Sequence, residues 1–418
     1  MNMTMAETIL ARASGRDQVK PNEFVTARID KVIVHEAMAA VALSLAEAGV
    51  KKIWDPDRVI VALDHYVPPH TTRAAAIHQL VRQTVEQFGI KHYYGDRGGV
   101  AHQVMVENGH VSPGDLILGA DSHTCTYGAL GAAACGIGMS EMAYVMSEGE
   151  LWFQVPETIR VEISGTLHPA VGSKDVILKL AGDYSAEVAQ YKSLEFTGSA
   201  VDDMSISSRL TMSNMAVELG AKFGLFFPDE KTDAYLDQAG ADQTNRPQFH
   251  WDAPVARTIT LDVSDLAPQV AKPHTVDNVS PVTELREVEI HQAVLGSCTN
   301  GRPEDFQAAA EILKGKQVHD RVRLLVVPAS RKVYSQAIKD GSLSTLVEAG
   351  AIVLNPGCGP CFGGHSGLMN PFERCISSTN RNFKGRMGSD QAEIYLASPA
   401  TVAASALTGR ITDPRDYL

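Results

Sequence analysis

The sequence predicts an α/β protein of more than one domain, built on parallel sheets, and three observations support this. Short aliphatic or β-branched runs alternate with amphipathic helical segments, and most of the runs end at Gly-rich or polar turns. The 418 residues exceed what a single hydrophobic core usually holds. Hydrophobic residues make up 44% of the chain and charged residues 21%, which is typical of a globular protein and excludes a disordered one.

The expected strands share an apolar run bounded by turn residues, and they fall at residues 58–63, 115–118, 159–165, 290–295, 322–327 and 351–354. Two segments between them, 72–88 and 303–313, repeat apolar residues every three and four positions, which predicts amphipathic helices. The Gly- and Ala-rich segment 128–138 does not match the dinucleotide-binding fingerprint. We interpret this segment as a place where helices pack closely.

Two changes of composition suggest three α/β domains. The chain becomes rich in Ser, Asp and Lys after the strand expected near residue 160, and the stretch 268–285 lacks any periodicity. The predicted domains are therefore residues 1–160, 161–283 and 284–418.

The net charge and the lengths of the apolar runs argue against two classes of partner, nucleic acids and membranes. The net charge of −12, without a long run of Lys or Arg, argues against a nucleic-acid partner. The sequence has no uninterrupted apolar run of membrane-spanning length and no signal-peptide pattern at its start, so we expect a soluble cytoplasmic protein that does not enter a membrane. Six cysteines are few for this length, which predicts free thiols or metal ligands instead of a disulfide framework.

Two cysteine motifs give the strongest functional signal. Cys298 lies in a Gly-Ser-Cys-Thr-Asn-Gly segment after one expected strand, and Cys358 and Cys361 lie in a Pro-Gly-Cys-Gly-Pro-Cys segment after another. Groups at the carboxyl ends of parallel strands converge, so three thiols can meet there. Three thiolates suit a [4Fe–4S] cluster with one iron left open, whereas buried packing residues and a redox Cys-x-x-Cys pair are the alternatives. The other three cysteines are expected to be packing residues: Cys125, Cys135 and Cys375.

A second group combines imidazoles with carboxylates. Asp64 and His65 follow one expected strand, Asp121 and His123 follow another, and His102 lies between them in the sequence. A carboxylate beside an imidazole can set its tautomer and proton affinity, as the protonation of a departing hydroxyl requires. Helix caps or turn hydrogen bonds are the alternative interpretation of each pair.

Two arginines form a third candidate site. Arg381 and Arg386 flank a turn that contains Gly385. Guanidinium groups bind carboxylates with two parallel hydrogen bonds, so the pair suits an acidic substrate, although a solvated loop is the alternative.

Taken together, these motifs resemble those of the aconitase superfamily, and their order and spacing are similar to those of the large subunits of isopropylmalate dehydratases. The resemblance covers essentially the whole chain and rests on four blocks: Asp121-Ser122-His123-Thr124, Gly296-Ser297-Cys298-Thr299-Asn300, Cys358-Gly359-Pro360-Cys361 and Asn380-Arg381-Asn382-Phe383-x-Gly385-Arg386. It implies three domains of the aconitase type around a [4Fe–4S] cluster, and a hydro-lyase that converts 2-isopropylmalate to 3-isopropylmalate in leucine biosynthesis.

The resemblance also assigns residue roles. It implies that three cysteines bind the cluster: Cys298, Cys358 and Cys361. It implies a catalytic group formed by Asp64, His65, His102, Asp121, His123 and Glu218. The substrate-binding residues that it implies are Ser122, Asn214, Asn380, Arg381 and Arg386.

The chain departs from the family at two places. Met38 stands where relatives usually carry a Thr, which leaves homoaconitase and 2,3-dimethylmalate dehydratase as alternative activities. The swivelling fourth domain of aconitases is expected on a separate small subunit, which would supply the catalytic serine base. A metal-dependent sensor or binding module that uses the same cysteines is the non-enzymatic alternative.

Overall fold

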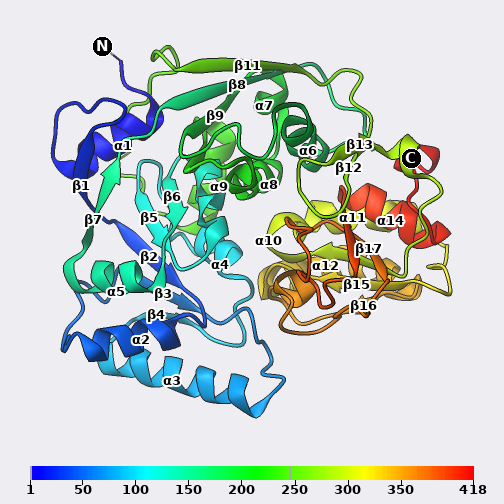
Figure 1. The fold of residues 1–418 in the computed structure, drawn as a ribbon, viewed down its shortest axis with the longest axis horizontal. Coiled ribbons are helices and arrows are strands. Elements are labelled where there is room, and N and C mark those ends of the chain that lie inside the picture. The colour runs from blue at the N-terminus through cyan, green and yellow to red at the C-terminus, as the bar shows by residue number, and fades with distance from the viewer. Residues whose placement is uncertain (1, 245) are drawn as a thin grey trace. The chain divides into compact units, whose positions relative to one another are not determined.

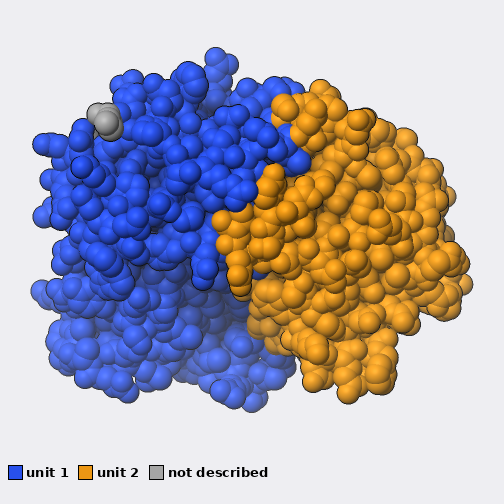
Figure 2. Space-filling view, turned by 45° about the horizontal axis from the view of Figure 1, so that its top comes forward, with its two compact units in different colours: residues 1–163, 189–261 blue, residues 164–188, 262–418 orange. Residues whose placement is uncertain are grey.

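The structure is a computed structural model that describes residues 2–244 and 246–418. Met1 and Asn245 fall within the predicted first and second domains and lie outside the described residues. The chain forms two compact units (Figure 2). Unit 1 comprises residues 1–163 and 189–261, and unit 2 comprises residues 164–188 and 262–418.

A parallel five-stranded sheet with the order β4-β3-β2-β5-β6 forms the first layer of unit 1 (Figure 1). Its strands in chain order are β2 (Lys31–Val34), β3 (Val59–Ala62), β4 (His92–Tyr94), β5 (Leu116–Gly119) and β6 (Ala133–Gly136). Strands β3 and β5 are buried throughout, because side chains of alternating residues enter hydrophobic clusters on opposite faces of the sheet. Residues of four helices fill these clusters: α2 (Met38–Glu47), α3 (Thr72–Phe88), α4 (Ala101–Glu107) and α5 (Met139–Glu148).

The rest of unit 1 contains a four-stranded sheet with the order β10-β9-β8-β11. Its strands are β8 (Thr158–Ser164), β9 (Ser193–Thr197), β10 (Phe223–Phe226) and β11 (Arg257–Asp262). A separate antiparallel pair joins β1 (Phe24–Arg28) to β7 (Glu150–Gln154). Helix α8 (Ile206–Met215) contacts the 3₁₀ segment η1 (Ser122–Leu130), which follows β5. The remaining helical segments of unit 1 are α1 (Met5–Ser14), α7 (Ser199–Asp203), η2 (Ala216–Leu219) and α9 (Glu230–Ala239).

Unit 2 is organised by a seven-stranded sheet with the order β13-β12-β18-β17-β14-β15-β16. The five strands β18, β17, β14, β15 and β16 pair in parallel, and β12 and β13 add an antiparallel edge. The strands are β12 (Gln269–Ala271), β13 (Val279–Pro281), β14 (Gln292–Gly296), β15 (Arg323–Val327), β16 (Ile352–Val353), β17 (Arg374–Ser377) and β18 (Glu393–Leu396).

The helical segments of unit 2 include α6, which precedes the rest of the unit by many residues in the chain. They are α6 (Ser173–Tyr184), η3 (Val282–Leu285), α10 (Ser297–Asn300), α11 (Pro303–Leu313), α12 (Arg331–Lys339), α13 (Ser342–Glu348), η4 (Gly359–Phe362), α14 (Pro399–Thr408) and η5 (Pro414–Asp416). A hydrophobic core of its own joins α11, α13 and α14 to the central strands.

The predicted α/β class with parallel sheets is confirmed, and the predicted helices at 72–88 and 303–313 match α3 and α11. We interpreted segment 128–138 as a place where helices pack closely. This is wrong for the middle of the segment, because Ala133–Gly136 forms strand β6. The three-domain division stays a prediction. Among the described residues, no helix is both long and apolar enough to cross a membrane.

Candidate active site

Asp64 and His65 form a tight pair at the end of β3, as expected. The carboxyl Oδ1 of Asp64 lies 2.5 Å from Nδ1 of His65. The other oxygen, Oδ2, accepts a hydrogen bond of 2.7 Å from the backbone N–H of Ala101 at the start of α4. Asp64 is buried, so one carboxylate both orients His65 and ties its loop to the helix that carries His102.

Glu36, in the turn before α2, lies beneath this loop. Its carboxylate accepts hydrogen bonds from the backbone N–H groups of Asp64, His65 and Tyr66, at 3.3, 3.0 and 2.9 Å. Nε2 of His78 lies 3.3 Å from the same carboxylate. A buried carboxylate is costly unless donors surround it, and here three backbone donors and an imidazole do so.

The charges around His65 favour its protonated form. Burial alone would lower the pKa of His65, but the carboxylates of Asp64, Glu36 and Asp121 outweigh burial and raise the pKa to about 9. The His35 ring stacks on His65 with a centroid distance of 4.2 Å. Burial would raise the pKa of Glu36, but the neighbouring His35, His78 and His65 hold it well below its usual range. His65 therefore carries a proton that it can give at neutral pH.

The ligand atoms of His35, Glu36, Asp64 and His65 lie within 4.8 Å of one another, which is a spacing that a cation could use. However, hydrogen bonds between Asp64 and His65 and from the backbone to Glu36 already engage these atoms. Hydrogen bonds thus join Asp64 to His65, and Glu36 to the backbone of the same loop.

His102, Asp121, His123 and Glu218 form a second connected chain. Nε2 of His102 lies 2.9 Å from Oδ1 of Asp121, and that oxygen also accepts a hydrogen bond of 2.7 Å from the backbone N–H of His123. Nε2 of His123 lies 2.7 Å from Oε1 of Glu218, which belongs to η2. His102 lies in the first turn of α4.

Asp121 is the ionised centre of this chain. Burial would raise its pKa, but hydrogen bonds and charge from His102 and His123 hold the pKa well below the usual range. Asn214, which is fully buried in α8, donates from Nδ2 to Oγ1 of Thr126 at 2.9 Å. The structure therefore anchors Asn214 to the same 3₁₀ segment that carries Ser122 and His123.

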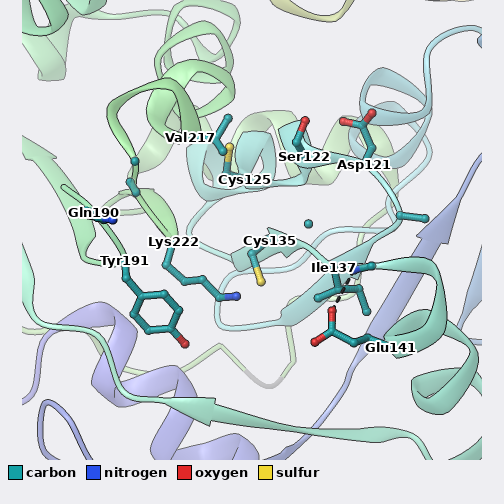
Figure 3. A pocket seen from close by; sticks show the side chains of 15 residues that line it. Asp121, Ser122, Cys125, Cys135, Ile137, Glu141, Gln190, Tyr191, Val217 and Lys222 are labelled. Atoms are coloured by element: carbon teal, nitrogen blue, oxygen red, sulfur yellow. Dashed lines mark hydrogen bonds between the residues drawn. The ribbon is translucent and has the colours of Figure 1, made fainter. Parts of the chain in front are cut away.

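Beside this chain, unit 1 contains a cavity of about 590 Å³ that Asp121 and Ser122 line together with Cys125, Cys135 and Lys222 (Figure 3). Burial raises the pKa of both thiols, so Cys125 and Cys135 stay protonated. Cys125 and Cys135, which were expected to be packing residues, thus also line the wall of this cavity.

In unit 2, Cys298 is presented by a sharp turn at the end of β14. Gly296 has a φ of +130°, and a Cβ at this position would lie 2.0 Å from the carbonyl oxygen of Val327. Only glycine fits such a turn. Arg302, which is buried, donates to the carbonyl oxygens of Cys298 and Thr299 at 2.8 Å each and so fixes the short helix α10.

Cys358 and Cys361 lie at a second turn of unit 2, and Asn380 connects this turn to Cys298. Nδ2 of Asn380 donates to Sγ of Cys298, and Sγ of Cys361 donates to Oδ1 of Asn380, both at 3.4 Å. The carbonyl oxygen of Cys358 accepts from Oγ of Ser297 and from the backbone N–H of Cys361, both at 3.3 Å. The three cysteines are at most 7% exposed. The structure thus brings the thiols of Cys298 and Cys361 to one amide and joins the backbone of Cys358 to the Cys298 turn.

These residues fit an iron–sulfur cluster. The donor set is three buried, unbridged cysteines with a polar amide between two of the thiols, and cubane clusters take thiolate ligands with hydrogen-bonded sulfurs. Arg381 directly follows Asn380 and stacks over Phe383 with 5.7 Å between its guanidinium carbon and the ring centroid. Arg386 lies in the same segment.

Sequence reasoning assigned no role to three buried polar residues that support these groups: Glu36, His78 and Arg302. Glu36 lies in the segment where relatives carry an acid, two residues before Met38, and no local motif marks His78. Arg302 follows the Cys298 motif closely, so its position just after that motif was the available signal.

Comparisons with known proteins identify the family of this chain. The family model of the aconitase family (aconitate hydratase) matches residues 7–289 and 281–409. The "3-isopropylmalate dehydratase large subunit 1" of Methanopyrus kandleri is 52% identical to this chain, and the alignment covers 100% of both chains. The corresponding large subunit of Heliobacterium modesticaldum is 45% identical, also over 100% of both. The "Probable methanogen homoaconitase large subunit" of Methanothermobacter thermautotrophicus is 44% identical over 99% of this chain and 98% of its own. The chain therefore belongs to the aconitase family, as its four sequence blocks predicted.

Proposed function

We propose that this chain is the large subunit of an isopropylmalate dehydratase that interconverts 2- and 3-isopropylmalate, with a [4Fe–4S] cluster and a separate small subunit. The observation that carries the proposal is that Asn380 contacts the thiols of Cys298 and Cys361, while the carbonyl oxygen of Cys358 accepts a hydrogen bond from Ser297, beside Cys298. The relatives that are similar over their full length bear the corresponding name. Six cysteines outside any disulfide suit the reducing cytoplasm in which we expect the enzyme to work.

Cys298, Cys358 and Cys361 would hold the cluster, whose open iron would supply Lewis-acid chemistry to the substrate hydroxyl and carboxylate. Asn380 would direct its amide to two of the ligand sulfurs, since it contacts both thiols. Arg302 would keep the Cys298 turn in place through its two carbonyl contacts.

His65 would protonate the departing hydroxyl. Its Nδ1 is engaged by Asp64, so Nε2 is the nitrogen that would give the proton. A pKa raised to about 9 keeps His65 protonated at neutral pH, while its three carboxylate neighbours stabilise the positive charge until transfer. The chain of His102, Asp121, His123 and Glu218 would hold water or substrate hydroxyl groups through alternating donors and acceptors.

Arg381 and Arg386 would bind substrate carboxylates, because a guanidinium can hold a carboxylate by two parallel hydrogen bonds. Ser122 and Asn214 would add polar contacts. The base that removes the proton next to a carboxylate would be a serine of the small subunit, and the resulting double bond would accept water at the neighbouring carbon.

The substrate assignment is tested by assaying the chain purified anaerobically with its small subunit. We expect absorbance of the unsaturated acid to rise when isopropylmalate is added. A homoaconitase activity is the second candidate, because one relative of 44% identity bears that name. Turnover of homocitrate or dimethylmalate without turnover of isopropylmalate would reassign the substrate.

The metal assignment is tested by analysing iron, sulfide and zinc. We expect about four irons with matching sulfide per chain. Cys361→Ser should lose the brown colour and the activity, whereas Cys375→Ser, a control at a buried thiol outside the cysteine group, should keep the iron. A content of about one zinc per chain would instead support the sensor or binding-module alternative.

A further inference from the structure

Lys174 is a fully buried lysine near the start of α6, with 1% of its surface exposed. Its Nζ donates to the carbonyl oxygen of Ser378 at 3.0 Å and also to that of Thr379. Both acceptors belong to the segment that leaves β17. These two contacts fasten α6 to this segment, although their partners are more than 200 residues apart in sequence.

The two carbonyls lie immediately before Asn380, whose side chain contacts the thiols of Cys298 and Cys361. The hydroxyl of Ser378 also accepts a hydrogen bond of 2.9 Å from the backbone N–H of Gly296, in the turn that presents Cys298. Lys174 therefore holds a segment that contacts both cysteine turns.

The helix that carries Lys174 is itself fixed. Asp175, which is fully buried, accepts hydrogen bonds from the backbone N–H groups of Gly172 and Gln269 at 2.9 and 2.8 Å. These bonds cap α6 and join it to β12. The backbone of α6 that carries the Lys174 ammonium group is therefore held in place by these hydrogen bonds.

Burying an ammonium is costly because its charge loses the solvation of water, and the neighbouring buried carboxyl of Asp175 offsets part of this cost. Negative charge at the cysteine turns would offset more of it. Three thiolate ligands add more negative charge than the core of an oxidised [4Fe–4S] cluster neutralises, and a fixed cation in a medium of low dielectric constant would stabilise that excess.

We propose that Lys174 is a positioning residue that fixes the Asn380 segment against the cysteine turns and supplies positive charge to the cluster site. The proposal rests on the proposed [4Fe–4S] cluster for its electrostatic part. The positioning part concerns the chain alone.

The positioning part is tested by hydrogen exchange in the cluster-free chain, with Lys174→Met, Lys174→Arg and a control, Lys179→Met. Lys179 lies on the same helix, is partly exposed and pairs with Asp183. We expect amides of residues 378–382 to exchange about tenfold faster in Lys174→Met than in the wild type, with Lys179→Met unchanged. Equal exchange in Lys174→Met and the wild type would overturn the positioning role.

The electrostatic part is tested in the reconstituted complex of both subunits by following the cluster's reduction midpoint with electron paramagnetic resonance. Lys174→Met should make the cluster harder to reduce, while Lys174→Arg, which keeps the charge, should stay close to the wild type. An unchanged midpoint in Lys174→Met would overturn this part.

Two further measurements separate the possible failures. If Lys174→Met does not fold by circular dichroism, Lys174→Arg carries the exchange test, because its bulkier planar group cannot reproduce both carbonyl contacts of the ammonium. If the wild type itself assembles no iron, the proposed function fails, whereas iron in the wild type with unaltered variants rejects only the role of Lys174.

Discussion

At the scale of single residues, His65 owes its proton to carboxylates from separate segments, Asp64 beside it and Glu36 below its loop. Glu36→Gln would keep an acceptor for the backbone N–H groups but remove one negative charge. We therefore expect the pKa of His65 to fall below about 9. The alkaline limb of kcat/KM should move to lower pH, as a pH–rate profile of the assembled enzyme would measure. Glu47→Gln, at an exposed site on α2, is the matched control.

The raised pKa of His65 also fixes the direction in which folding stability changes with pH. Because the folded-state pKa of His65 is about 9 and its ordinary value is 6.5, its contribution to folding is full below pH 6.5 and is lost as the pH rises through 9. The stability gap between wild type and Glu36→Gln should therefore narrow between those values. A gap in urea midpoints that is constant from pH 6 to pH 9.5 would contradict this account.

The sequence predicted those site residues that form local motifs. Asp64 with His65, and Asp121 with His123, each lie within three residues at a strand end, so their proximity follows from the chain itself. Glu36 and Lys174 could not be predicted in this way, since their partners lie about 30 and 200 residues away and depend on tertiary packing. Buried polar residues of this kind carry no sequence signature that separates them from surface ones.

At the scale of elements, the turn after β14 depends on Gly296. Gly296→Ala would place a Cβ 2.0 Å from the carbonyl oxygen of Val327 at a φ of +130°. We expect a loss of about 3 kcal/mol or more of stability, with reduced iron content, because both strain and collision act at the turn that presents Cys298. Gly315→Ala is the control: its φ is +70°, and nothing lies within 4 Å of the added Cβ. Its cost should stay near the backbone term of about 1–2 kcal/mol. Equal midpoints in denaturant titrations of the two variants would refute this.

Strand β6 shows where composition misleads at this scale. Its sequence is Ala-Ala-Cys-Gly, and residues of this kind are not strong strand formers, so the segment looked like helix packing. Small residues are needed because the neighbouring turn lies close: a Cβ on Gly136 would lie 2.6 Å from the carbonyl oxygen of Asp121. The strands around it were predictable from their aliphatic runs, as β3, β5 and β14 show.

At the scale of the whole molecule, the division into units does not follow chain order, because residues 164–188 join the later part of the chain. Their attachment comes from α6, through Lys174 to the segment after β17 and through Asp175 to β12. The amino-acid composition changes near residue 160, which marks a possible boundary. It does not reveal against which unit the following helix, α6, packs.

Each unit has a hydrophobic core of its own, and the three proposed cluster ligands all belong to unit 2. A ligand that binds only the folded state stabilises the element that binds it. Chelating the iron should therefore lower protection against hydrogen exchange mainly at residues 292–302, 356–362 and 377–382, and should leave the strands of the five-stranded sheet in unit 1 nearly unchanged. Calorimetry should show the matching loss in the transition of unit 2. Equal losses throughout both units would mean that the cluster stabilises the chain through a cooperative unit larger than the one that holds its ligands.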